Sequence, residues 1–300
     1  MNITRSDISI PLPDGVNLGA WLYTPDGDGR YPAITMAHGF GGTKYHGLDR
    51  IARRIAEAGF VVCLHDHRGF GDSGGVPRQD IDPYRQIEDW RRVIAHLQTL
   101  EVVDSERIGI WGSSYSGGHA LVLGATDRRL RAVYAQVPTA SGSESGRRRI
   151  PPHLVAEVER EFAADELAQA KGSSPATQRF VSADVGERAS YRSADAIAFY
   201  LQDVPPGKWD NTVTIQSNRR ARSYDPAHWI DQISPTPLLM VVAANDTVAP
   251  TDLALAAYER ALQPKELLLV PGGHFDPYLS GFETTSGAAV AFFAQHLRGG

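Results

Sequence analysis

Cysteine is almost absent from this sequence of 300 residues, which contains a single one, Cys63. One thiol can form neither an internal disulfide bond nor a metal site built from cysteines. Cys63 lies inside the apolar run Phe60–Leu64. We therefore expect a buried structural side chain rather than a reactive thiol.

Long apolar runs are also missing. No segment approaches the roughly 20 apolar residues that a helix needs to span a bilayer. The first residues, Met1–Asp7, have no apolar signal core. From these two observations we expect a cytoplasmic protein that does not insert into a membrane.

Neither sign of charge is in large excess, since the sequence has 30 lysines and arginines and 35 acidic residues, for a net charge of −5. This balance favours neither nucleic acid nor an anionic membrane as a partner. The length suits one large domain, or one domain that carries an insertion. The oligomeric state is left open, a homodimer included.

Strand-like and helix-like segments alternate along most of the chain. Pro13-Asp14-Gly15 is a turn signal that predicts an antiparallel hairpin between the first two strands. Such alternation indicates an α/β fold, with a mostly parallel central sheet and helices on both faces. Ligands of such folds bind beyond the carboxyl ends of the strands. The predicted strands span residues 7–12, 16–23, 31–37, 60–65, 107–112, 130–136, 237–243 and 266–270, and helical spacing occurs over 48–56, 87–97, 251–262 and 285–297.

The alternation stops between residues 139 and 225. A structureless loop of that length is implausible, so we expect a helical lid or cap at 139–225, inserted into an α/β-hydrolase core formed by 1–138 and 226–300. Arg147–Arg149 are expected to form a solvated helix flank, with binding of an acidic substrate as the alternative. The aromatic residues of the insertion suggest an apolar pocket for an acyl or alcohol group, with exposed or core positions as an equally common alternative; they include Tyr191, Phe199, Tyr200 and Trp209.

The segment Ile108–Gly118 has the layout of a nucleophile elbow, in which an apolar strand, a tight serine-bearing turn and a helix follow one another. The chain turns so sharply there that the residues two before and two after the serine must be small. With Ser114 as the nucleophile, these are Gly112 and Ser116. Ser116 is itself the alternative nucleophile. We favour Ser114 because the strand ends at Gly112, which leaves Ser114 at the apex of the turn.

A serine hydroxyl needs a base, and the base needs an acid that orients it. His274 follows the last predicted strand directly, and Asp246 follows the strand before it. Asp276 is a rival acid because it lies two residues after His274. The order Ser114, Asp246, His274 is that of the α/β-hydrolases. Two further acids have ordinary explanations. Asp252 is expected in the first turn of a helix, and Asp225 is expected to be a loop carboxylate.

The oxyanion of a tetrahedral intermediate needs hydrogen-bond donors. The backbone N–H of Tyr115, directly after the nucleophile, is one. The loop His38-Gly-Phe-Gly-Gly after the third strand offers a second, from the N–H of Phe40, and its glycines allow backbone to approach a substrate closely. One such donor is typically worth roughly 2.7–4 kcal/mol in the transition state.

These motifs resemble those of the serine α/β-hydrolase superfamily along nearly the whole chain. The elbow at Gly112–Gly118, the loop at His38–Gly42, Asp66-His-Arg-Gly-Phe-Gly-Asp-Ser, Asn245-Asp246 and Gly273-His274-Phe each resemble a motif of that superfamily. The chain is most similar to its dienelactone-hydrolase-like and X-Pro dipeptidyl-peptidase (S15)-like esterase branch. Cocaine-esterase-like members use a tyrosine hydroxyl in the oxyanion hole; Phe40 has none, so the resemblance implies a hole made of backbone alone.

The sequence thus predicts a serine hydrolase that cleaves the carboxylic ester of a small acyl substrate through an acyl-enzyme, with no metal or organic cofactor. The same residues suit an amide or peptide bond, or the C–C bond of a β-diketone. They also suit transfer of the acyl group to an alcohol or amine. A non-catalytic binding protein with the same fold is the remaining alternative.

Overall fold

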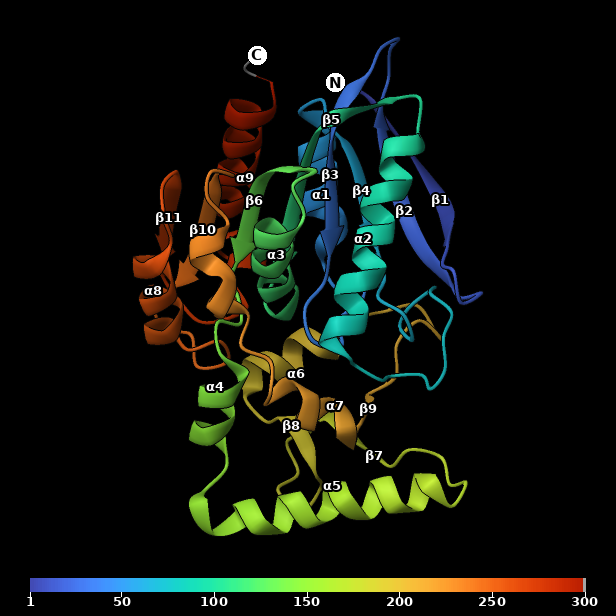
Figure 1. Ribbon diagram of the computed structural model, residues 1–300, viewed down its shortest axis with the longest axis vertical. Coiled ribbons are helices and arrows are strands. Elements are labelled where there is room, and N and C mark those ends of the chain that lie inside the picture. The colour runs from blue at the N-terminus through green and yellow to red at the C-terminus, as the bar shows by residue number, and fades with distance from the viewer. Residues whose placement is uncertain (299–300) are drawn as a thin grey trace.

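An eight-stranded sheet runs through the centre of the structure, a computed structural model in which residues 1–298 are described (Figure 1). The strand order is β1-β2-β4-β3-β5-β6-β10-β11. β1 pairs antiparallel with β2 and β2 with β4, and the other neighbours are parallel. This confirms the predicted α/β-hydrolase fold class with its mostly parallel sheet. The strands are β1 (Ile3–Pro11), β2 (Asn17–Pro25), β3 (Tyr31–Ala37), β4 (Val61–His65), β5 (Val103–Ser113), β6 (Leu130–Gln136), β10 (Leu238–Ala243) and β11 (Lys265–Val270).

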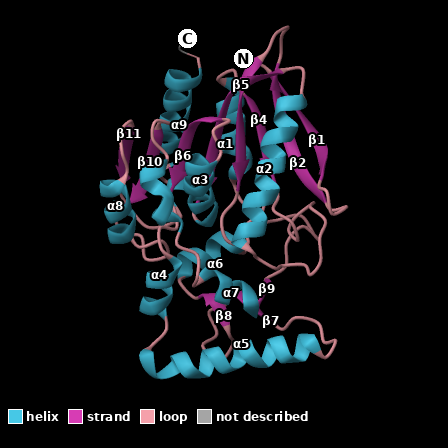
Figure 2. Ribbon diagram, viewed as in Figure 1, coloured by secondary structure: helices cyan, strands magenta, loops and turns pink. Residues whose placement is uncertain are grey.

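Helices cover both faces of this sheet (Figure 2). α1 (Leu48–Glu57) and α9 (Phe282–Leu297) pack together on one face, and α2 (Pro83–Thr99), α3 (Tyr115–Thr126) and α8 (Thr251–Arg260) lie on the other. Each amphipathic helix turns its apolar side to the strands. The central parallel strands β3, β4 and β10 are mostly apolar because both of their faces are covered.

The predicted hairpin is present and is longer than expected, since β1 and β2 pair from Ile3↔Pro25 to Pro11↔Asn17. Its turn is closed by a hydrogen bond from the N–H of Gly15 to the carbonyl of Leu12, with Gly15 at a φ of 83°. Cys63 is fully buried in β4, as expected, and burial raises the pKa of its thiol to about 12. That thiol is therefore protonated at neutral pH.

The segment 139–225, which we call the insert, lies across the carboxyl ends of the parallel strands (Figure 1). The prediction of helices alone is wrong here, because a three-stranded sheet of order β8-β7-β9 accompanies them. Strands of three to five residues are too short to leave a clear alternating pattern in the sequence. The elements of the insert are α4 (Gly142–Arg149), η1 (Pro152–Leu154), α5 (Val155–Ala170), β7 (Thr177–Val181), β8 (Ala189–Tyr191), α6 (Ala194–Tyr200), β9 (Thr212–Thr214) and α7 (Ile215–Ala221).

Two further short 3₁₀ helices lie outside the insert, η2 (Pro226–Gln232) beside α3 and η3 (Asp276–Tyr278) before α9. None of the helices within residues 1–298 is both long enough and apolar enough to cross a membrane. The longest helix of the insert, α5, lies at the end of the molecule opposite the two chain termini (Figure 1).

Candidate active site

Ser114 lies at the junction between β5 and α3, with backbone angles φ 57° and ψ −118°. A residue other than glycine rarely adopts a positive φ, and such strain is typical of functional turns. Backbone hydrogen bonds hold the turn in place: the N–H of Ser114 donates to Gln136 at 2.8 Å, and its carbonyl accepts from Thr139 at 2.9 Å. A Cβ on Gly112 would collide with the carbonyl oxygen of Ser116, so the small residue there is a steric requirement.

Three side chains that are far apart in the sequence meet at this turn. His274 Nε2 lies 2.9 Å from the Oγ of Ser114, and His274 Nδ1 lies 2.7 Å from the Oδ2 of Asp246. The exposed fractions are 7% for Ser114, 6% for Asp246 and 3% for His274. Asp246 follows β10 and His274 follows β11, so the parallel sheet brings both to the edge at which β5 ends.

Asp246 is held in position by its own loop. Its Oδ1 accepts hydrogen bonds from the backbone N–H groups of Val248 and Ala249, each at 2.8 Å. That leaves Oδ2 to accept from Nδ1–H of His274. With the proton on Nδ1, the lone pair of Nε2 faces the hydroxyl of Ser114.

The two alternatives considered from the sequence occupy other positions. Ser116 is fully buried; its hydroxyl donates to the carbonyl of His38 at 2.5 Å and lies 2.7 Å from Nε2 of His67. Asp276 accepts from the N–H of Gly273 at 2.7 Å and from the hydroxyl of Ser280 at 2.7 Å. The geometry therefore pairs His274 with Ser114 and Asp246, while Asp276 shapes the loop that carries His274.

The loop after β3 passes directly beside Ser114. A Cβ on Gly39 would lie 2.6 Å from the Cβ of Ser114, so only glycine allows this approach. Within residues 1–298, the backbone N–H groups of Phe40 and Tyr115 form no hydrogen bond. Both residues line the cavity that contains Ser114. Two unpaired N–H groups beside a serine hydroxyl are the arrangement that an oxyanion requires.

The insert holds this loop from the other side. The hydroxyl of Tyr200 donates to the carbonyl of Phe40 at 2.8 Å, and the indole N–H of Trp209 donates to the carbonyl of Gly41 at 2.9 Å. We did not predict either contact from the sequence. The available signal in the sequence was the presence of a Tyr and a Trp in the insert. The hydroxyl or indole N–H of such a residue normally finds a partner when the residue is buried.

The aromatic residues of the insert do not form the apolar pocket that we expected. Tyr191 lines the cavity, whereas Phe199, Tyr200 and Trp209 pack against the ring of His46 with centroids 5.3–6.3 Å apart. Phe199 and Tyr200 also pack against rings from the loop after β11 and from β7, with centroids 4.5–4.6 Å apart. These three residues therefore follow the alternative of a core position and do not line an acyl pocket.

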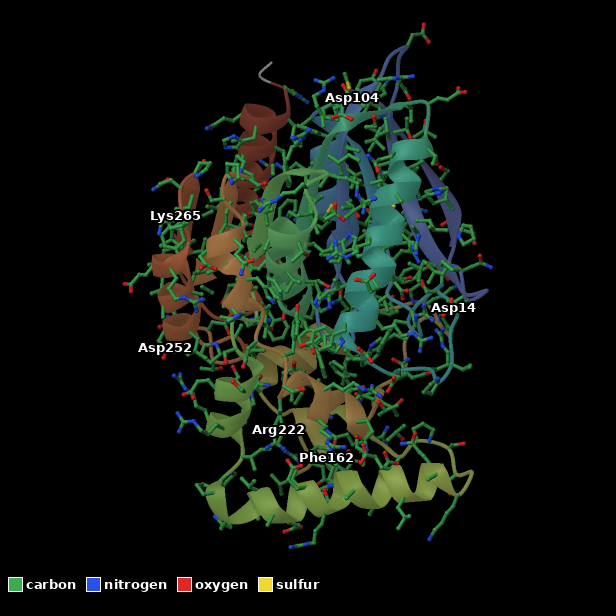
Figure 3. All side chains as sticks on the ribbon, in the orientation of Figure 1. Asp14, Asp104, Phe162, Arg222, Asp252 and Lys265 are labelled. Carbon is green, nitrogen blue, oxygen red and sulfur yellow. The ribbon has the colours of Figure 1, made fainter. Side chains whose placement is uncertain are left out.

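A cavity of about 520 Å³ opens between Ser114 and the insert. It is bounded on the core side by Phe40 and Tyr115. On the insert side, residues from α4, α5, β8 and α7 line it, among them Phe162 and Arg222 (Figure 3). Its walls combine apolar side chains with several arginines, so both an acyl chain and a polar group can be accommodated.

Five further histidines are buried near this edge of the sheet and are neutral at pH 7. Burial lowers the pKa of the His46 ring to about 4 and that of His67 to about 3. It lowers the pKa of the other three well below the ordinary range. None of the five contacts Ser114 through a hydrogen bond in the described residues. These histidines are His38, His46, His65, His67 and His119.

In the part of the chain that the structure describes, no three His, Cys, Asp or Glu side chains gather in a way that could hold a metal ion. The two acids that were not expected in the site, Asp252 and Asp225, form contacts away from it. Asp252 pairs with Arg148 on the surface (Figure 3). Asp225 accepts from the hydroxyls of Ser141 and Ser143, each at 2.7 Å.

Comparison with known proteins gives consistent results. The family profile of the X-Pro dipeptidyl-peptidase (S15 family) matches residues 14–276. The chain is 33% identical to the quorum-quenching protein AidA of Acinetobacter baumannii, over 93% of this chain and 91% of that protein. It is 30% identical to the thiohydrolase aneE of Aspergillus aculeatus, over 99% and 95% of the two chains.

A third relative is known both by sequence and by structure. The chain is 28% identical to the polyketide transferase grgF of a Penicillium species, over 98% of each chain. The crystal structure of the α/β hydrolase GrgF from Penicillium sp. sh18 superposes with a TM-score of 0.86 at 26% identity, covering 99% of this chain and 100% of that one. The similarity therefore includes the insert as well as the core.

Proposed function

We propose that this chain, which belongs to the X-Pro dipeptidyl-peptidase (S15) family of α/β-hydrolases, is a serine hydrolase that cleaves a carboxylic ester or thioester. The observation that carries the proposal is the position of His274, hydrogen bonded to Ser114 on one side and to Asp246 on the other. A serine becomes a nucleophile when a base takes its proton and an acid holds that base in the correct tautomer.

In the proposed reaction, the Oγ of Ser114 attacks the carbonyl carbon of the substrate while Nε2 of His274 takes the hydroxyl proton. Asp246 stabilises the imidazolium that results. Collapse of the tetrahedral intermediate breaks the bond to the leaving alcohol or thiol, which receives the proton from His274. Water then attacks the acyl-enzyme by the same steps, which releases the acid and restores Ser114.

The negative charge that develops on the carbonyl oxygen would be bound by the N–H groups of Phe40 and Tyr115. Their lack of other partners supports this role. Because Phe40 has no hydroxyl and the loop offers backbone alone, the proposed oxyanion hole consists of two amide groups. Loss of one such donor typically lowers kcat by roughly 10²–10³-fold.

Two observations favour an ester or thioester over a peptide. A relative that matches along almost the whole chain is named a thiohydrolase. A peptidase that releases dipeptides must also bind a cationic amino terminus, which carboxylates recognise. Among the described residues that line the cavity there is one carboxylate, Glu161, and it already pairs with Arg188.

The test is covalent labelling with a fluorophosphonate, followed by location of the adduct. We expect the parent protein to be labelled on Ser114 and to hydrolyse p-nitrophenyl butyrate. The Ser114→Ala variant should lose both properties. Ser116→Ala is the matched control, since it removes a hydroxyl two residues away; it should still be labelled. An adduct on Ser116, or turnover by a folded Ser114→Ala variant, would disprove the assignment.

Acyl transfer is a second candidate, favoured by the relative named polyketide transferase. In this version an alcohol or amine, rather than water, attacks the acyl-enzyme, and the residues keep the same roles. The cavity of about 520 Å³ has room for a small acceptor beside an acyl group. Product analysis with added alcohols and amines distinguishes the two, because transfer yields a new ester or amide in place of the free acid.

The insert is proposed to act as the lid of this site. It lies across the carboxyl ends of the strands (Figure 1) and supplies most of the residues that line the cavity. It also fixes the loop that carries Phe40 through Tyr200 and Trp209. Substrate choice and oxyanion binding would thus depend on the same segment.

A further inference from the structure

Four arginines line the cavity beside Ser114, and the proposed acyl chemistry uses none of them: Arg149, Arg188, Arg192 and Arg222. Glu161 is the one carboxylate among the described residues that line it. The chain as a whole carries a net charge of −5. The positive lining is therefore a local property of the cavity and does not follow from a generally basic surface.

Two of these arginines are neutralised by acids. Arg188 forms an ion pair with Glu161, and Arg222 pairs with Glu159 of α5 at 2.9 Å (Figure 3 labels Arg222). These pairs tie the residue before β8 and the residue after α7 to α5. Their charges are largely balanced, so they contribute less to binding of a further anion.

The other two have no carboxylate partner among the described residues, although the guanidinium of Arg149 lies 5.7 Å from the centre of the Tyr191 ring. Arg149 donates to the carbonyl of Val248, and Arg192 donates to the carbonyls of Asp184 and Glu187. Within residues 1–298, neither forms an ion pair with a carboxylate. A guanidinium carries five N–H donors and no acceptor, and its fork matches a carboxylate or a phosphate. Both side chains therefore keep a charge without a counter-ion at the cavity.

The three arginines of the run Arg147–Arg149 differ in their partners. Arg147, with 75% of its side chain exposed, pairs with Glu144, and Arg148 pairs with Glu144 and Asp252. Arg149 alone lines the cavity. All three arginines are exposed, as expected for a solvated flank, and the third also lies at the cavity where a substrate would bind.

Neutral donors in the same cavity also lack partners. The Nδ2 of Asn218 is buried and makes no hydrogen bond in the described residues, although its Oδ1 accepts from Ser190 at 3.0 Å. The hydroxyl of Tyr115, a residue that is 4% exposed, is likewise buried without a partner. A buried donor left unpaired costs free energy, which an acceptor on a ligand would recover.

We propose, on the basis of the function proposed above, that the substrate carries an anionic group, a carboxylate or a phosphate, remote from its reacting carbonyl. Arg149 and Arg192 bind this group, and the amide of Asn218 donates to it, while the carbonyl lies at Ser114. The anion supplies a counter-ion to the two arginines and an acceptor to the amide of Asn218. Neutral acyl substrates of the same length supply neither and are processed less efficiently.

The two sources of the anion can be separated with thioesters. In the acyl arm, the N-acetylcysteamine thioester of adipate, which has a free carboxylate, is compared with that of hexanoate. In the leaving-group arm, hexanoyl-coenzyme A, which carries phosphates, is compared with hexanoyl-N-acetylcysteamine. We expect kcat/KM to be roughly 10–100-fold higher for the anionic member of one pair, as the loss of a charge-assisted hydrogen bond implies.

Arg149→Gln and Arg192→Gln should each reduce that ratio by about 10-fold or more. Arg147→Gln is the matched control, because it removes a charge from the same helix outside the cavity, and it should keep the parent ratio. A preference in the acyl arm assigns a carboxylate, and one in the leaving-group arm assigns a phosphate. Equal kcat/KM within both pairs of substrates for the parent would overturn the proposal.

Failure of the proposed anion site can be distinguished from failure of the proposed hydrolase function. A protein that is labelled at Ser114 by the fluorophosphonate and hydrolyses neutral thioesters without any anionic preference retains the function and refutes the binding site. A folded protein that is neither labelled nor active on any of the four thioesters refutes both. The ratio in the parent protein needs no variant, so misfolding of an arginine variant cannot obscure the result.

Discussion

Lowering the pH from 7 to 5 should strongly destabilise this protein, because it buries a group of neutral histidines. Burial lowers the pKa of His46 to about 4 and of His67 to about 3, and it lowers those of His38, His65 and His119 well below the ordinary range. In the unfolded chain each titrates at about 6.5. Between the two values the unfolded state binds protons that the folded state does not.

The direction of the effect follows from that difference. Stability is fully present above about pH 6.5 and is lost as the pH falls toward the folded pKa. One pH unit corresponds to about 1.4 kcal/mol per group, so at pH 5 His46 and His67 each remove about 2 kcal/mol from the free energy of unfolding. The other three histidines act in the same direction, so the loss is a large part of the roughly 5–15 kcal/mol of a typical domain.

Two buried carboxyl groups increase the free energy of unfolding as the pH falls, which is opposite to the effect of the histidines. Burial raises the pKa of Asp66 and of Asp89, so the folded state holds their protons more tightly as the pH falls through the raised values. Since the histidines are more numerous than these two carboxyls, we expect the free energy of unfolding to fall as the pH drops below about 6.5.

The assay is urea unfolding followed by tryptophan fluorescence in steps of half a pH unit from 7.5 to 5, repeated with His65→Leu. Neither ring nitrogen of His65 has a hydrogen-bond partner in the described residues, and the ring packs against Trp90 at 5.0 Å. Leucine there cannot be protonated. The loss of stability between pH 7 and 5 should therefore be smaller than in the parent protein.

His153 provides the control, since it lies exposed on the insert. His153→Gln should follow the curve of the parent protein. A free energy of unfolding that stays constant between pH 7 and 5 would refute the reasoning. So would a pH dependence of His65→Leu that matches that of the parent.

Three further predictions concern single residues. Asp246→Asn should lower kcat by about 10⁴-fold in a folded protein, since it removes the acceptor that sets the tautomer of the base; a normal ester hydrolysis rate would contradict the role of Asp246. Tyr200→Phe should lower kcat about 3–10-fold with little change in KM, because the carbonyl of Phe40 loses its hydrogen bond; steady-state kinetics would show instead a pure KM effect if the hydroxyl served only substrate binding. Lys44→Met should cost about 3–5 kcal/mol in urea unfolding, because it leaves the buried carboxylate of Asp66 without its ion pair; unchanged stability would mean that this carboxyl is already protonated.

The core and the meeting of Ser114, Asp246 and His274 could be anticipated because each of these residues directly follows a predicted strand. In a parallel sheet all such positions lie at one edge, so chain order alone places the side chains near one another. The choice between Ser114 and Ser116 depended on where the strand ends. That, too, is visible in the sequence as the glycine before the turn.

The interior of the insert could not be anticipated in the same way. β8 and β9 are three residues long, too short for a periodic pattern. Successive residues of a helix point about 100° apart, so the sequence Arg147–Arg149 does not say which of the three faces the cavity. The aromatic residues likewise take their positions from tertiary contacts, among them those with the loop after β3, which lies more than a hundred residues away in the chain.

The two hydrogen bonds from the insert to the loop after β3 have a consequence for how this enzyme could change. Tyr200 and Trp209 belong to the segment that shapes the cavity, yet they hold the backbone of Phe40 and Gly41 beside Ser114. Exchange of the insert for that of a relative would therefore alter reactivity together with substrate range. A chimera that keeps its catalytic rate must retain the Tyr200 hydroxyl and the Trp209 indole N–H. A change of insert would therefore affect substrate specificity and catalytic rate together.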